Sequence, residues 1–194
     1  MSELKVNKIS PATGTAFTLG DSGDTFTVPS GATITNSGTA TGFGGGKVLQ
    51  LLQTAKLDSY SQTAEAWTDI TGLSIAITPA STSNKIFVMV AINASKAGGG
   101  GNGSFRLLRG STVIGASTVG STYNGFGMTD QGIESNTMGS KNCQFLDSPS
   151  STSATTYKVQ LYNSNTSYAS RINQRGSDTG YGAMSSITVM EIGA

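Results

Sequence analysis

The ten residues Asn84-Lys-Ile-Phe-Val-Met-Val-Ala-Ile-Asn93 carry the strongest secondary-structure signal in the chain. In a β-strand they place one apolar set, Ile86, Val88, Val90 and Ile92, on one face, and a second set, Phe87, Met89 and Ala91, on the other. An antiparallel strand with one face in water alternates apolar with polar residues. We therefore expect this strand to be covered on both sides. One cover is the opposite sheet of its own domain, and the other is either a second layer of the same chain or another copy of the chain.

The composition predicts an all-β protein with many turns. The chain has 194 residues, of which 26 are glycine and only 12% are charged, and its Val, Ile and Thr residues are clustered. The net charge of +1 leaves no electrostatic footprint for nucleic acid or an anionic membrane. No run approaches the roughly 18–20 apolar residues of a membrane span. We expect no nucleic-acid partner and no membrane insertion.

The chain contains few of the residues that catalysis needs. It has no histidine, which is the commonest general base and the commonest metal ligand. Asp130 and Glu134 share a loop, but nothing in the sequence holds them at the separation that glycan hydrolysis requires. We therefore expect no enzyme activity, no cofactor and no metal. The single cysteine, Cys143, excludes an intrachain disulfide, and the start of the chain lacks the apolar core of a secretion signal, so we expect synthesis in the cytoplasm.

Residues 1–46 have no pattern that could close a core alone. Four apolar anchors recur every eight or nine residues, each followed closely by Gly or Pro: Phe17, Phe26, Ile34 and Phe43. A unit this short cannot bury its apolar face by itself, but three copies wound together could point the anchors at a shared axis. The alternative is a flexible Gly/Ser/Thr linker. Residues 1–10 are either a docking segment for another structure or a disordered tail.

Residues 47–194 form the predicted head. The glycines at 44–46 mark its boundary, after which the strands become longer and more apolar. About eight main strands, without a convincing amphipathic helix, indicate a jelly roll or a related β-sandwich. We expect these strands at residues 47–54, within 67–78, and at 84–93, 104–109, 111–116, 141–146, 155–162 and 185–192.

The loops between these strands alternate in length. If each strand reverses direction, the long loops lie together at the tip far from residue 47, where a rigid scaffold commonly displays binding residues. The long loops are residues 55–64, 94–103, 117–140 and 163–184. Their mixture of aromatic and polar side chains suits a sugar or another polar surface, as it does in antibody loops. The candidate receptor-binding residues are Tyr123, Asn124, Phe126, Tyr168, Arg171, Asn173, Arg175 and Tyr181. The alternative is that the tyrosines pack down onto the head and order the loops.

Several stretches resemble a known family. Trp67-Thr-Asp-Ile-Thr-Gly-Leu-Ser-Ile-Ala-Ile-Thr-Pro79 and Ser83-Asn-Lys-Ile-Phe-Val-Met-Val90 are similar to the C-terminal heads of bacteriophage fibre and virion structural proteins, especially those of marine and cyanobacterial phages. So are Phe105-Arg-Leu-Leu-Arg-Gly110 and Ser185-Ser-Ile-Thr-Val-Met-Glu-Ile192, while Leu4-Lys-Val-Asn-Lys-Ile-Ser-Pro-Ala-Thr-Gly-Thr15 looks like the start of such fibres. The resemblance implies a trimeric jelly-roll head of the tumour-necrosis-factor-like kind. It implies no fixed ligand residues.

Together these observations predict a homotrimeric phage virion fibre protein, assembled in the host cytoplasm and carried on the tail or capsid surface. It would consist of a docking segment and thin intertwined shaft (1–46) and a jelly-roll head (47–194) that adheres to a bacterial surface glycan or protein. Residues 1–10 would bind another virion protein, and Phe87 and Met89 would join the shaft anchors in the trimer interface. The alternatives are a capsid-decorating or tail-bracing protein, a glycan-cleaving enzyme, and a bacterial tumour-necrosis-factor-like module.

Overall fold

The structure is a computed structural model that describes residues 9–11, 13–14, 18, 20–35, 37, 46–119, 122–129 and 137–194. The chain separates into two compact units, Met1–Phe43 and Gly44–Ala194. The described residues of the first unit form turns without a strand or helix, and Phe26 and Ile34 are exposed there. Phe17, Phe43 and residues 1–8 lie outside the described residues, so the intertwined shaft and its docking segment stay predictions.

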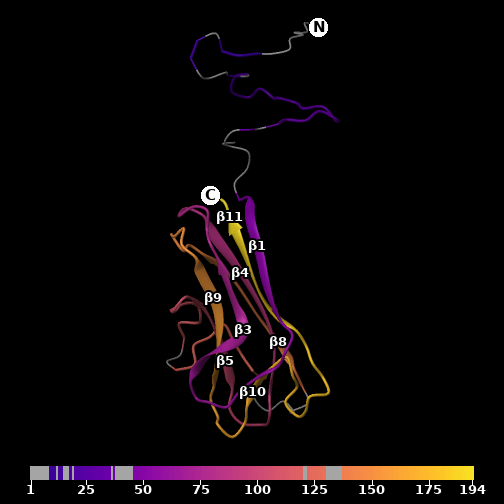
Figure 1. Cartoon of the computed structure of the whole chain (residues 1–194), viewed down its shortest axis with the longest axis vertical. Coiled ribbons are helices and arrows are strands. Elements are labelled where there is room, and N and C mark those ends of the chain that lie inside the picture. The colour runs from indigo at the N-terminus through magenta and orange to yellow at the C-terminus, as the bar shows by residue number, and fades with distance from the viewer. Residues whose placement is uncertain are drawn as a thin grey trace. The chain divides into compact units, whose positions relative to one another are not determined.

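Strands build the second unit, which confirms the all-β prediction. None of the residues described in it belongs to a helix, and all eight predicted main strands are present (Figure 1). They are β1 (Val48–Lys56), β3 (Trp67–Ile77), β4 (Lys85–Lys96), β5 (Gly103–Arg109), β6 (Thr112–Gly115), β8 (Gly139–Asp147), β9 (Thr155–Asn163) and β11 (Ser185–Ile192). Three short strands inside the predicted loops were not expected: β2 (Tyr60–Gln62), β7 (Gly127–Met128) and β10 (Ser170–Ile172).

The strands form two antiparallel sheets. In sheet A, β11 lies between β1 and β4, and β8 pairs with the other edge of β4. The short strands β10 and β2 extend sheet A beside the last residues of β4. In sheet B the order is β3-β9-β5-β6, and β7 also pairs with β5. Apart from the β5–β6 hairpin, the strands that pair are therefore not consecutive in the sequence.

The core lies between the inner faces of the two sheets. The regular alternation along β4 buries Ile86, Val88, Val90 and Ile92 completely or almost so. Sheet B contributes Phe105, Leu107, Tyr157, Val159 and Leu161 to the same cluster. Because each side chain of the cluster is removed from water by the opposite sheet, this layer supplies the hydrophobic stabilisation of the sandwich.

The long loops and the chain end lie at opposite ends of the sandwich (Figure 1). At one end, the N–H of Gly193 donates to the carbonyl of Lys47 at 2.8 Å, so the last strand closes beside the start of β1. At the other end the long loops contact one another, for example through the N–H of Ser164 and the carbonyl of Asn102 at 2.9 Å. The loop end is thus a separate surface, held by the ends of both sheets.

Candidate functional site

Within the second unit, no described segment forms a layer over the second face of β4. Phe87 and Met89 are half-buried and Ala91 is exposed, whereas the residues between them are buried. The described residues of the second unit therefore do not supply the second layer that the sequence offered as one of two alternatives. The uncovered side is the outer face of sheet A.

An apolar row crosses this outer face. Directly paired residues on neighbouring strands point to the same side of a sheet, and the register joins four such residues into one row: Leu51, Met190, Phe87 and Leu146. Leu51 is 61% exposed and Leu146 is 52% exposed. We call these four residues the apolar row.

The rows that follow the apolar row are uncharged. The next row is Gln53, Thr188, Met89 and Gln144, and the one after it is Ala55, Ser186, Ala91 and Asn142. The three rows therefore hold no charged side chain. Charged residues are depleted at the cores of protein interfaces, and a continuous exposed apolar patch marks an interaction surface. The outer face of sheet A has the composition of such a surface.

The outer face of sheet B differs from that of sheet A, because a charged ladder crosses it. Nε of Arg106 donates to Oε1 of Gln160 at 2.9 Å, and Nε2 of Gln160 donates to Oδ1 of Asp69 at 2.7 Å. Nζ of Lys158 completes the ladder with an ion pair of 2.8 Å to Oδ2 of Asp69. The hydrogen bonds lower the pKa of Asp69 despite partial burial, which by itself would raise it. This face is suited to water or to a polar ligand.

A row of aromatic rings lies beside the charged ladder. The ring centroids of Trp67 and Tyr162 are 5.5 Å apart, and those of Tyr162 and Tyr123 are 5.0 Å apart. The guanidinium of Arg106 lies 4.2 Å from the centroid of Trp67. We call Trp67, Tyr162 and Tyr123 the aromatic platform. Sequence reasoning selected only Tyr123, because the other two rings belong to different strands and only the β3–β9 register brings them together.

The candidate residues Tyr123, Asn124 and Phe126 do not form one exposed surface at the loop end. Tyr123 is half exposed, and its ring lies against Tyr162 on the outer side of sheet B. Phe126 is half-buried, with its ring centroid 6.2 Å from that of Phe105 in the core. The Oδ1 atom of Asn124 is buried and has no hydrogen-bond partner among the residues that the structure describes. Of these three candidates, Tyr123 presents the largest surface to a partner.

In the loop after β10, Tyr181 is held by Arg175, which is itself paired with Asp178. Arg175 donates two hydrogen bonds to the carboxylate of Asp178, one of them 2.8 Å from Nε to Oδ1, and its guanidinium lies 4.1 Å from the ring centroid of Tyr181. The bonds from Arg175 and from the N–H of Gly180 lower the pKa of Asp178 to about 2. Tyr181 is 62% exposed. The ion pair therefore fixes the loop while the tyrosine ring remains accessible.

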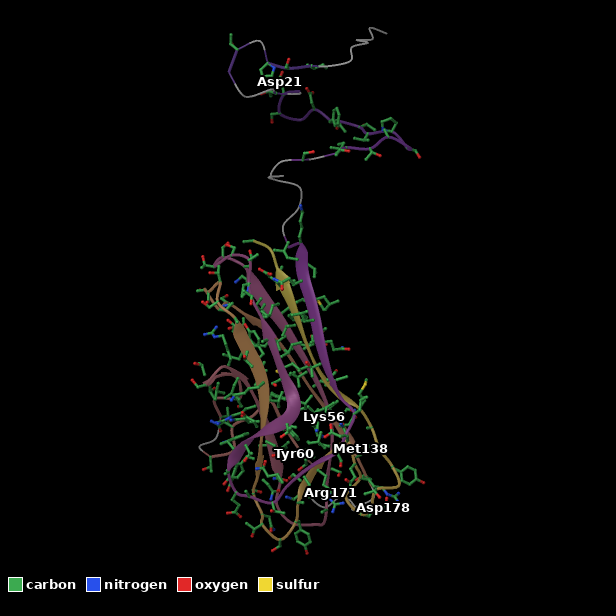
Figure 2. All side chains as sticks on the ribbon, in the orientation of Figure 1. Asp21, Lys56, Tyr60, Met138, Arg171 and Asp178 are labelled. Carbon is green, nitrogen blue, oxygen red and sulfur yellow. The ribbon has the colours of Figure 1, made fainter. Side chains whose placement is uncertain are left out.

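Arg171 lies at the same end of the sandwich as Asp178 (Figure 2), and Tyr168 belongs to the loop just before β10. Arg171, on β10, is half-buried, and its Nη1 lies 3.4 Å from the carbonyl of Arg175. Tyr168 is 41% exposed, and its ring rests against Gly98, where a Cβ atom would lie only 2.2 Å from the Tyr168 Cδ1 atom. Tyr168 thus orders the loop after β4 as well as presenting an edge at the surface.

Asn173 has to be removed from the candidate binding residues. It is buried, with a φ of 61°, and its Nδ2 donates to the carbonyls of Lys56 and Asp58 at 2.8 and 3.0 Å. Its Oδ1 accepts from the hydroxyl of Ser185 at 2.6 Å. Asparagine tolerates this left-handed conformation because its short polar side chain bonds to nearby backbone. Asn173 therefore ties the loop to the end of β1 and does not reach the surface.

A buried lysine lies at the same end of the sandwich. Lys96 is 5% exposed, and its Nζ donates to Oδ1 of Asn163 and lies 3.4 Å from the hydroxyl of Ser170. Burial lowers the pKa of this lysine to about 8. The side chain links the ends of β4, β9 and β10, and sequence reasoning missed it because nothing in its sequence neighbourhood signals burial.

The described residues contain no group of three or more His, Cys, Asp or Glu side chains arranged to hold a metal ion. In the same part of the chain, no helix is long and apolar enough to cross a membrane. Neither a comparison of the sequence with protein-family models nor a comparison with curated proteins found a match. The two candidate surfaces, the outer face of sheet A and the loop end with the adjoining platform, are therefore interpreted from geometry and chemistry.

Proposed function

We propose that the protein is a homotrimeric bacteriophage virion fibre protein whose head adheres to the surface of the host. The observation that carries the proposal is the apolar row on the uncharged outer face of sheet A. A second copy of the chain is the occupant that best suits this face, because the opposite outer face carries the charged ladder and can remain in water. The three-copy assembly is supported by the short repeat of residues 1–46 and by the resemblance to phage fibre heads.

The strand order supports a jelly-roll head within this proposal. Eight strands form two four-stranded antiparallel layers, β1-β11-β4-β8 and β3-β9-β5-β6, and a jelly roll is a double-sheet arrangement of eight strands. A trimer of such heads would bury the outer face of each sheet A near the common axis. The loop ends would then face in one direction.

Three loop ends in one assembly would multiply a weak contact. After one head engages a surface, the second and third engagements are intramolecular, so the avidity exceeds the affinity of one site without any new contact. The exposed Tyr181, held by Arg175, is the best-placed contact residue of the loop end. No cofactor is needed for this mode of action.

The experiment that tests the proposal has two parts. Light scattering on a sizing column measures the native mass of the full chain, and a mass three times that of one chain is expected. Antibody labelling of virions that contain the protein then locates it, with a label on the tail fibres expected. A monomer at all concentrations would contradict the trimer, and a label on the capsid shell would favour the decorating role instead.

A further inference from the structure

The aromatic platform leaves much of its ring surface exposed to solvent. Tyr123 is 50% exposed, Trp67 and Tyr162 are half-buried, and Met128, in the same cross-strand row, is 51% exposed. Burying aromatic surface is one of the largest stabilising contributions available to a protein. Rings that stay together at the surface, instead of scattered singly, mark an interaction site.

The platform lies directly beside fixed hydrogen-bonding groups. Trp67 and Tyr162 form one cross-strand pair, and Asp69 and Gln160 form the pair two residues along the same strands. The carboxylate of Asp69 accepts one bond at each oxygen and its side chain is half exposed. A carboxylate has about four acceptor sites, so Asp69 retains acceptors for further donors. Arg106 holds the ladder against the Trp67 ring.

From this juxtaposition we infer that the aromatic platform binds a carbohydrate. The C–H face of a pyranose ring would stack on Trp67 and Tyr123, and its hydroxyl groups would bond to Asp69 and Arg106. A purely apolar partner fits poorly, because it would take the charged ladder out of water without replacing its hydrogen bonds. A neutral polyol with an apolar face can stack on the aromatic platform and also form hydrogen bonds with the charged ladder.

The inference rests on the proposed adhesive function and deepens it. It places the sugar contact on the outer side of sheet B, next to the loop end, in addition to the contact residue Tyr181. If the outer face of sheet A is buried between copies, the outer face of sheet B remains accessible in each of them. The assembly and the carbohydrate site are therefore compatible.

Tryptophan fluorescence tests the inference directly, because Trp67 is the only tryptophan in the chain. The full chain is titrated with hexasaccharides of glucose, galactose, mannose and N-acetylglucosamine. A saturable change in emission is expected with at least one of them. Tyr123→Ala should weaken that binding about tenfold or more, as truncation of an aromatic contact residue does. Tyr123→Phe, which keeps the ring, should bind within about twofold of the wild type.

Asp69→Asn and Thr156→Ala complete the set of variants. Asp69→Asn should weaken the binding of the same hexasaccharide, whereas Thr156→Ala, at an exposed position near the start of β9 and away from the platform, should leave it unchanged. Circular dichroism checks that each variant is folded. The inference is overturned if no hexasaccharide changes Trp67 emission saturably, or if folded Tyr123→Ala binds as the wild type does.

Adhesion to bacterial cells separates this inference from the proposed function. If the wild type adheres and the platform variants adhere equally well while Tyr181→Ala does not, the carbohydrate site is rejected and the adhesive function stands. If the wild type binds the hexasaccharide but adheres to no bacterium tested, the adhesive function is rejected and the carbohydrate site stands. Loss of both activities in Tyr123→Ala supports both.

Discussion

The hydroxyl group of Tyr157 donates a hydrogen bond of 2.7 Å to Oδ2 of Asp147, and this bond joins the two sheets inside the sandwich. Tyr157 belongs to β9 in sheet B and is fully buried, whereas Asp147 ends β8 in sheet A. Nη1 of Arg109 contacts both carboxylate oxygens at 2.8 and 2.9 Å. The carboxylate is therefore satisfied from two strands of sheet B, β5 and β9.

Removing the Tyr157 hydroxyl should weaken the sandwich. We expect Tyr157→Phe to lower the free energy of unfolding by about 1–3 kcal/mol, because Asp147 loses a buried donor. Burial, together with the hydrogen bond to Asp147, raises the pKa of Tyr157 above its ordinary value of 10.0. The folded protein thus keeps a proton that the unfolded chain loses above that pH, so the wild type should lose stability in alkali and the variant should lose less. Urea unfolding measures both effects, with exposed Tyr181→Phe as the control.

The buried carboxylate of Glu191 should not tolerate an amide. It accepts from Nε2 of Gln50 at 2.5 Å, from the N–H of Ala80 at 2.6 Å and from Nδ2 of Asn84 at 2.6 Å. Glu191→Gln would place an NH₂ group against one of these donors, and we expect a loss of about 1–3 kcal/mol in the free energy of unfolding. An unchanged urea midpoint would contradict this role.

Acid should weaken the stabilisation that the hydrogen bonds of Glu191 provide. Burial acts to raise the pKa of Glu191, but the hydrogen bonds outweigh it and lower the pKa below its ordinary value of 4.5. The carboxylate therefore contributes stability above that pH, and the contribution disappears as the pH falls through the lowered pKa. The difference in unfolding free energy between wild type and Glu191→Gln should shrink in acid.

Replacing Lys96 should stabilise the protein at neutral pH. Charged Lys96 is buried with no carboxylate partner in the described ranges of the chain, and an apolar residue of similar length removes the cost of taking that charge out of water. Lys96→Met leaves Asn163 its bond from Ser170, 2.7 Å from Oγ to Oδ1. We expect thermal unfolding of Lys96→Met at a higher temperature than that of the wild type.

The higher stability of Lys96→Met relative to the wild type should decrease in alkali. The folded-state pKa of Lys96 is about 8, against an ordinary value of 10.5. Between these values the folded protein releases a proton that the unfolded chain keeps, so this group makes the wild type more stable as the pH rises. The two proteins should therefore converge toward pH 10.5. A difference independent of pH would show that folding does not lower the pKa of Lys96.

A charge in the apolar row should separate the copies. Phe87→Asp places a carboxylate in the middle of the uncharged face, where an interface with another copy would have to desolvate it. We expect the native mass to fall to that of one chain, while the strand content measured by circular dichroism stays the same. Thr156→Asp, at an exposed position of β9, is the matched control and should keep the mass of the wild type.

The Arg175–Asp178 pair should control adhesion through Tyr181. Asp178→Ala releases Arg175 from the loop, so we expect weaker adhesion to bacteria with little change in the unfolding temperature.

The double variant Tyr123→Ala, Tyr181→Ala should adhere still less without unfolding the head. Because the pKa of Asp178 is about 2, the pair remains charged through mildly acidic pH, and this loop should give adhesion no pH dependence there. Unchanged adhesion by the double variant would refute the role of both tyrosines.

The alternation of apolar and polar residues in the sequence was sufficient to predict the long strands. In β4 the alternating residues from Ile86 to Ile92 reach the core, and the bounds of β9 and β11 agree with the prediction to within a residue. β2, β7 and β10 escaped because two or three residues show no period. β10 and β7 form along the edges of β4 and β5, and β2 in turn pairs with β10.

The candidate site was less accessible from the sequence. Tyr181 and Arg175 are close in the chain, and reasoning about one loop found both. Trp67 and Tyr162 are brought together by strand register, which no local pattern encodes. Asn173 was misassigned because a polar loop residue has the same appearance in a sequence whether its side chain meets solvent or satisfies backbone carbonyls.

The hydrogen bond between Gly193 and Lys47 has a practical consequence for experiments. The carboxyl terminus emerges at the end of the sandwich opposite the long loops (Figure 1). A peptide tag fused after Ala194 would therefore anchor the head to a sensor chip or a bead with its loops directed into solution. Immobilised in this orientation, the head becomes a reagent for capturing cells, and its loops can be diversified without disturbing the anchor.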